Sequence, residues 1–151
     1  MSSSTLPGTG HEAGASGNAL PTARGLHIAL WVTQGLLAAA FLAAGKGKIF
    51  MSADELGQRI PWVAQTGTSL VRFIGLSECA GALGLILPSV TRIAPKLTSV
   101  AALGLVLVML LAAGFHILRG EAQFVPVNLL LGGIAGFIAW GRLRGAPIPS
   151  R

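Results

Sequence analysis

Glu78 is the single ionisable residue in an apolar run that extends from Phe73 to Val90. A carboxylate in a segment long enough to cross a bilayer is costly in hydrocarbon, so it normally faces the interior of a helix bundle and has a partner there. Such a group can form a structural ion pair, hold the polar head of a ligand or exchange a proton with it. Which of these applies depends first on whether the run lies in a membrane.

The composition predicts that it does. The chain has 151 residues, which suggests one domain, and a mean hydropathy of +0.71 with 11% charged residues. Soluble domains carry about a quarter charged residues, so the shortfall indicates contact with lipid. Four apolar runs, 28–45, 73–90, 97–115 and 124–141, approach the roughly 20 residues that a helix needs to cross a bilayer. We therefore expect an all-α fold, an integral membrane four-helix bundle.

The connections between the runs predict the topology. Short links follow the second and third runs, so neighbouring helices are expected to be antiparallel in an up-down-up-down bundle with both termini on one side. The predicted parts are a disordered Ser/Gly-rich N-terminal tail at 1–25, a transmembrane domain at 26–142 with spans of about 26–45, 70–90, 97–118 and 123–141, and a short basic C-terminal tail at 143–151.

The first connection, residues 46–67, is longer than the others. Ile49, Ala53, Leu56 and Ile60 fall on one helical face. This pattern predicts a short amphipathic helix that lies along the membrane interface after the first span. A solvated loop is the alternative.

The net charge of +6 does not indicate a nucleic-acid partner, because the Lys and Arg residues are scattered and form no basic stripe. Basic residues beside membrane spans are the ordinary case. Six of the eleven fall on the side of the termini, which places both termini in the cytoplasm. Cys79 is the one cysteine, so no internal disulfide is expected. The histidines have no metal-site spacing, and no metal is expected.

The antiparallel topology brings polar residues from all four spans to one half of the bilayer, and the other half is expected to hold almost nothing polar below its rim. The predicted cluster comprises Lys46, Lys48, Arg72, Glu78, His116, Glu121 and Asn128. Arg72 and Glu78 are six residues apart and project about 120° from each other on an ideal helix. The partner of Glu78 is therefore expected on another helix. Lys46, Lys48 and His116 are the candidates.

Three segments carry a resemblance to a known family. They are similar to the DoxX-like family of small four-helix bacterial membrane proteins. The three segments are FLAAGKGKIF, which follows Gln34, then VRFIGLSECAGALGLILPSV and LVMLLAAGFHILRGE. The resemblance extends from about residue 27 to 142, and it implies a multi-pass protein of the bacterial inner membrane. Lys48, Glu78, His116 and Glu121 fit the polar positions of the family. Some relatives are subunits of quinone-linked thiosulfate oxidation or membrane partners of redox-defence enzymes.

Two interpretations of the polar cluster stay open. It either holds the helices together or lines a pocket for a small lipophilic molecule or a membrane partner, with Glu78, Arg72 and His116 at its centre. The pocket interpretation makes the chain an accessory or binding protein rather than a self-sufficient enzyme.

The alternative function is a quinone-reactive membrane subunit of an oxidoreductase complex, in which His116 or Glu78 exchanges a proton with the quinone. The sequence has no flavin, iron–sulfur, haem or dithiol motif, so a redox role would need a quinone, a partner protein or both. The expected partners are the lipid bilayer, membrane redox proteins and a second copy of the chain in a homodimer.

Overall fold

The computed structural model describes residues 21–60 and 62–151, and every regular element within these ranges is a helix. The four long helices are α1 (Pro21–Phe50), α4 (Thr68–Thr91), α5 (Lys96–Leu118) and α6 (Val125–Trp140). Each of them, α6 together with the short turns at its two ends, belongs to a segment long and apolar enough to cross a membrane. The predicted all-α bundle of four antiparallel spans is confirmed.

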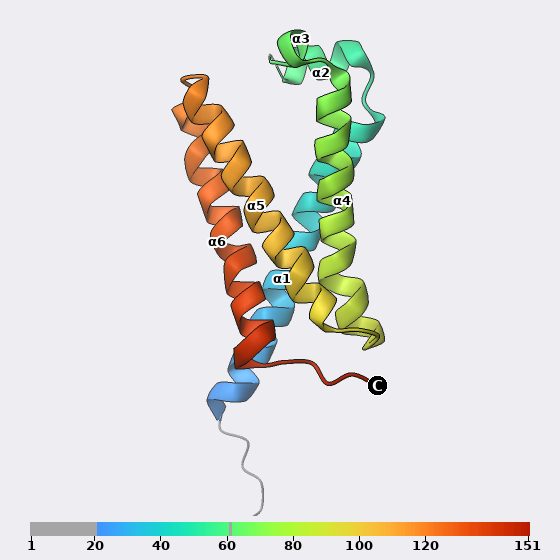
Figure 1. Cartoon of the computed structure of the whole chain (residues 1–151), viewed down its shortest axis with the longest axis vertical. Coiled ribbons are helices and arrows are strands. Elements are labelled where there is room, and N and C mark those ends of the chain that lie inside the picture. Colours follow the sequence, from blue (N-terminus) through green and yellow to red (C-terminus); the bar gives the residue numbers. More distant parts are fainter. Residues whose placement is uncertain (1–20, 61) are drawn as a thin grey trace, which may run out of the picture.

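The bundle consists of two helix pairs (Figure 1). Helix α1 packs along α4, and α5 packs along α6. The pairs meet where the C-terminal segment lies and diverge toward the opposite end, which carries α2 and α3. We call these the terminal end and the distal end. Contacts of α4 with α5, and of α6 with α1, join the pairs.

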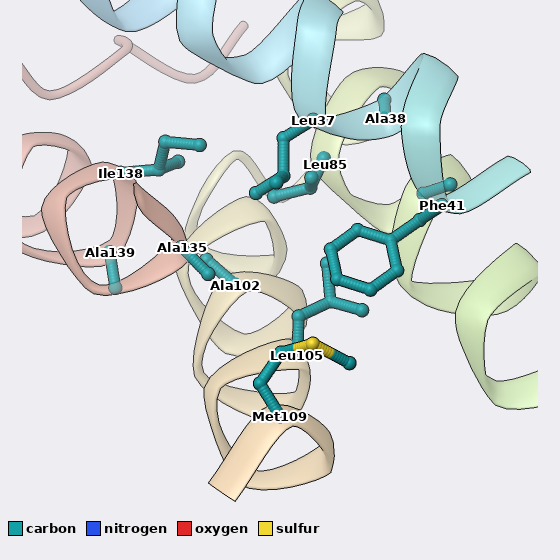
Figure 2. Close-up of a cluster of buried hydrophobic side chains, with 11 residues drawn as sticks. Leu37, Ala38, Phe41, Leu85, Ala102, Leu105, Met109, Ala135, Ile138 and Ala139 are labelled. Atoms are coloured by element: carbon teal, nitrogen blue, oxygen red, sulfur yellow. The ribbon is translucent and has the colours of Figure 1, made fainter. Parts of the chain in front are cut away.

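The core is formed by side chains from all four long helices. Figure 2 shows Leu37 and Phe41 of α1 beside Leu85 of α4, with Leu105 and Met109 of α5 opposite them. The remaining buried members of this cluster are Ala38, Ala82, Ala102, Ala135, Ile138 and Ala139. The outward faces carry many exposed leucines and valines. Lipid is the solvent that such a surface requires, because a water-soluble monomer does not expose apolar area on this scale.

Small residues let the helices of the bundle approach closely. A Cβ at Gly81 of α4 would lie 2.5 Å from the Leu105 side chain of α5, and one at Gly84 would lie 2.6 Å from the Cβ of Ala101. Small residues allow such contacts in membranes, where the hydrophobic effect does not press helices together. The small-residue spacing of the second span is therefore used within the chain.

The first connection forms two short helices, α2 (Ala53–Arg59) and α3 (Val63–Thr66). Ser52 begins α2 with a capping box: its Oγ accepts from the Glu55 N–H at 3.2 Å, and the Glu55 carboxylate accepts from the Ser52 N–H at 2.9 Å. Leu56 is fully buried. The predicted short helix after the first span is confirmed.

The ends of the long helices differ from the predicted boundaries. Helix α1 begins at Pro21, so residues 21–25 are helical rather than part of the predicted tail; residues 1–20 lie outside the described ranges. Helix α1 also continues to Phe50, because the lysines at its end are good helix formers and do not stop a helix. Beyond α6, the turn η2 (Gly141–Gly145) is a π-helix that carries Arg142 into the bundle.

Candidate functional site

Two glycines set the crossing of α1 and α4 at the distal end. A Cβ at Gly45 would lie 2.7 Å from the Gly75 carbonyl oxygen, and a Cβ at Gly75 would lie 2.9 Å from the Gly45 carbonyl oxygen. Both distances are too short for any side chain, so the two backbones touch. The next residues on the same helix faces, three positions further along each chain, are Lys48 and Glu78.

Lys48 is the partner of Glu78. Its Nζ donates to both carboxylate oxygens, at 2.8 Å to Oε1 and 2.7 Å to Oε2. The exposed fraction is 6% for the Glu78 side chain and 22% for that of Lys48, so the pair is reached from the lysine side. One of the three partners that the sequence proposed is thus the one found, and it lies on another helix as expected.

A second polar group lies on the other helix pair, where α5 ends. His116 Nδ1 lies 2.8 Å from Glu121 Oε2, and Arg119 Nε donates to Glu121 Oε1 at 3.0 Å. The hydrogen bond with His116, assisted by Arg119, holds the pKa of the Glu121 carboxyl below its ordinary value. The His116 ring also packs on Phe124 at 5.0 Å between centroids and meets Phe115 edge-on at 6.0 Å.

Helix α3 connects the two helix pairs at the distal end. Arg119 Nη1 donates to Gln65 Oε1 at 2.7 Å, and the Trp62 ring meets the Phe115 ring edge-on at 5.1 Å between centroids. The guanidinium of Arg119 also lies over the Phe115 ring. The segment after the first span therefore reaches across to α5 and ties the end of one pair to the other.

The predicted cluster does not form one connected group. No hydrogen bond or ion pair among residues 21–60 and 62–151 joins the Lys48–Glu78 pair to the group around His116. Arg72 is exposed on α4 and has no ion pair there, and Lys46 is exposed and lines a shallow cavity with Glu55. The up-down topology sets which end a residue occupies, but the lateral spread of the helix pairs separates the two groups.

Asn128, the last member of the predicted cluster, is buried at the start of α6. Its Nδ2 donates to the Phe124 carbonyl oxygen of its own helix at 3.1 Å. Asn128 thus satisfies a local backbone group rather than a charge on another helix.

A polar network at the terminal end was missed by the sequence analysis. Gln34 Nε2 donates to the Leu85 carbonyl oxygen at 2.7 Å and to Ser89 Oγ at 3.3 Å, and Ser89 Oγ lies 2.8 Å from Thr98 Oγ1. Arg142 Nε donates to Gln34 Oε1 at 2.5 Å. The expectation that this half would hold almost nothing polar was wrong, because neutral side chains inside apolar runs carry no charge to reveal them.

The described residues contain no group of three His, Cys, Asp or Glu side chains that could hold a metal ion. The side chains at the distal end offer hydrogen bonding and proton exchange. Lys48 supplies an ammonium, and His116 supplies an imidazole whose Nδ1 is fixed by a carboxylate.

The sequence was compared with known proteins. No curated protein and no solved structure matched it. A family model, that of the DoxX-like family, matches residues 32–138, which include α4, α5 and most of α1 and α6. The Lys48–Glu78 pair and the His116–Glu121 pair both lie within the matched range. The chain belongs to the DoxX-like family, and it is an integral membrane protein.

Proposed function

We propose that the protein is an accessory membrane protein that binds a small lipophilic molecule at the distal end, with the polar head of the ligand on Lys48. The observation that carries this proposal is that the Lys48 ammonium has more N–H donors than Glu78 has oxygens to accept them. An ammonium has three N–H donors, and the two oxygens of Glu78 are the acceptors that the described residues give it. One donor is left for a ligand on the exposed side of Lys48.

A purely structural role explains the pair less well. Burying two charges removes them from water, and their attraction does not reliably outweigh that loss. The close approach of Gly45 and Gly75 already holds α1 against α4 through backbone contact. The ion pair is therefore not needed to bring the two helices together.

A second candidate function, a quinone-reactive subunit of an oxidoreductase complex, is favoured by the surroundings of His116. Its ring packs on Phe124, and Glu121 holds Nδ1, while no described residue bonds Nε2. Because Nδ1–H donates to Glu121, Nε2 carries a proton only in the imidazolium form, which would donate to a quinone carbonyl and pass that proton to it. The electrons would come from a partner protein in the same membrane.

Ligand retention separates these functions. The full chain would be purified in mild detergent, its bound lipophilic molecules identified by mass spectrometry, and a menaquinone and a ubiquinone titrated onto it. The informative variants are Lys48→Met and His116→Asn. Lys46→Met is the matched control, because Lys46 is an exposed lysine of the same helix.

Loss of the bound molecule in Lys48→Met but not in Lys46→Met supports the first function. Loss of quinone binding in His116→Asn supports the second. If wild type and all three variants bind no lipophilic molecule and no quinone, both proposals fail.

Localisation and assembly complete the proposal. We place the protein in the bacterial inner membrane with both termini in the cytoplasm, on the six-to-five balance of basic residues. Reporter fusions after Arg151 test this orientation, and activity of a periplasmic reporter would contradict it. A homodimer or a membrane redox partner would be detected by crosslinking in native membranes.

A further inference from the structure

We propose that the terminal end carries a phosphate-binding site, in which Arg142 and Lys96 hold the phosphate of an anionic lipid headgroup or a free phosphate ion. The site lies at the opposite end of the bundle from Lys48 and does not depend on the proposed function. Four observations support it. The buried guanidinium of Arg142 is incompletely bonded, and no acidic side chain of the described ranges belongs to this end. Several hydrogen-bond donors lie close together, and a cavity adjoins Arg142.

Arg142 is buried, with 5% of its surface exposed. Its Nε donates to Gln34 Oε1, its Nη1 donates to the Ala146 carbonyl oxygen at 3.3 Å, and its guanidinium lies over the Trp31 ring. Its Nη2 is buried without any hydrogen-bond partner among the described residues. A buried donor left in this state costs free energy, so an acceptor from outside the chain would satisfy it.

No acidic side chain of the described ranges forms an ion pair with Arg142. The acidic side chains of the described ranges are Asp54, Glu55, Glu78 and Glu121, and all belong to the distal end. The terminal end instead gathers Arg24, Arg92, Lys96, Arg142, Arg144 and Arg151. A buried cation normally has a paired anion. An anion supplied from outside would complete the pair.

His27 adds to the excess of donors. Trp31 Nε1 donates to His27 Nε2 at 3.1 Å, and Arg142 Nη1 lies 3.4 Å from His27 Nδ1. A neutral imidazole has one acceptor nitrogen, so the two contacts are not both hydrogen bonds. With Nε2 accepting from Trp31, the proton is on Nδ1. Two donors then face each other, and an anion beside them would accept from both.

A cavity of about 320 Å³ adjoins Arg142. Arg142 and Lys96 line it, together with Pro95 and residues of the C-terminal segment such as Pro147 and Ile148. Lys96 begins the 23-residue helix α5, whose dipole favours an anion at this end.

Phosphate suits this set of donors better than other anions of the cell. A guanidinium binds phosphate oxygens through two N–H groups at once, and a nearby ammonium adds charge. Helix ends of a spanning bundle also lie at the level of lipid headgroups, where basic pockets bind anionic lipids. Both the headgroup and the free ion present the same oxygens.

The experiment measures thermal unfolding of the full chain in a neutral detergent through its tryptophan fluorescence. One arm adds phosphatidylglycerol and compares it with phosphatidylcholine of the same acyl chains. The other adds sodium phosphate and compares it with sodium chloride of equal ionic strength. We expect Tm to rise with phosphatidylglycerol, because a ligand that binds the folded state stabilises it. A rise with sodium phosphate alone assigns the site to the free ion.

The variants Arg142→Gln, Lys96→Gln and Arg144→Gln make the result specific. Arg142→Gln is expected to weaken the affinity for the phosphate ligand by at least about tenfold, which corresponds to the loss of one charge-assisted hydrogen bond. Lys96 is exposed, so Lys96→Gln keeps the test valid if Arg142→Gln does not fold. Arg144→Gln is the matched control, since Arg144 is an exposed arginine of the same turn.

The proposal is overturned if phosphatidylglycerol raises Tm no more than phosphatidylcholine does, and sodium phosphate raises it no more than sodium chloride does. It is also overturned if Arg144→Gln weakens binding as much as Lys96→Gln does. That result would mean that basic surface charge, rather than the cavity, attracts the anion.

Discussion

Gly45 and Gly75 touch backbone to backbone, and each lies one helical turn from a member of the Lys48–Glu78 ion pair. The contact brings the axes of α1 and α4 close enough for the Lys48 ammonium to donate to both carboxylate oxygens of Glu78. The position of the candidate site is thus determined by two residues that have no side chain.

Replacing Gly75 with alanine tests this dependence. The new Cβ would lie 2.8 Å from the Lys48 Cβ and 2.9 Å from the Gly45 carbonyl oxygen, so α1 and α4 must separate. We expect a loss of about 1–3 kcal/mol in unfolding free energy, as for other overpacked sites, measured by denaturation in detergent. Gly133→Ala is the control, because a Cβ there meets nothing within 4 Å. Equal losses in the two variants would contradict the argument.

The ion pair predicts a strongly non-additive double-mutant cycle. Lys48→Met leaves the buried Glu78 carboxylate without its partner, and such a loss costs roughly 3–5 kcal/mol in other proteins. Adding Glu78→Gln removes the orphaned charge, so the double variant should be more stable than Lys48→Met alone. Arg72→Met, which removes an exposed charge of α4, should have little effect. A double variant as unstable as the sum of the single ones would show that the two groups are not coupled.

The lowered pKa of the Glu121 carboxyl predicts a loss of stability in acid. The hydrogen bond with His116 lowers the pKa of its carboxyl in the folded protein, below the ordinary value of 4.5. A lowered folded pKa means that the stabilisation is complete above pH 4.5 and is lost as the pH falls through the folded value. Stability measured from pH 6 to pH 3 should therefore fall less steeply in Glu121→Gln than in wild type. An unchanged slope would contradict the pairing, and Asp54→Asn serves as a control of equal charge.

The terminal network predicts that Gln34 stabilises the whole bundle. Gln34→Leu would leave the buried Arg142 Nε without its acceptor and would remove the bond that ties α1 to the Leu85 carbonyl oxygen of α4. Each unsatisfied buried group costs about 1–3 kcal/mol, so a clear drop in Tm is expected. Thr33→Val is the neighbouring control, because the Thr33 hydroxyl bonds only carbonyl oxygens of its own helix in the described structure. A drop of the same size in both variants would show that the network adds nothing.

The spans and the partner of Glu78 could be predicted from the sequence for one physical reason. Hydrocarbon penalises charge strongly, so long uncharged runs mark the helices, and a lone carboxylate requires a cation on a neighbouring helix. Lys48 satisfies that requirement. Arg72 was included because it occupies the same end, yet its helical phase turns it outward, where it is exposed.

The terminal network could not be predicted in the same way. Gln34, Ser89 and Thr98 are neutral and can bond backbone groups of their own helices, so their presence in an apolar run indicates no particular partner. Arg142 was placed at the end of a span beside the C-terminal tail, because one basic residue after an apolar run commonly marks the membrane boundary. The π-helical turn that brings it inward has no clear pattern in the sequence.

The bond between Gln34 and Arg142 joins the first long helix to the last turn of the chain. During synthesis the amide of Gln34 enters the bilayer well before its guanidinium donor leaves the ribosome. Closure of the terminal network therefore requires the segment after α6, which lies 108 residues further along the chain than Gln34. A chain that ends before residue 142 would leave the Gln34 amide oxygen inside the bundle without this donor.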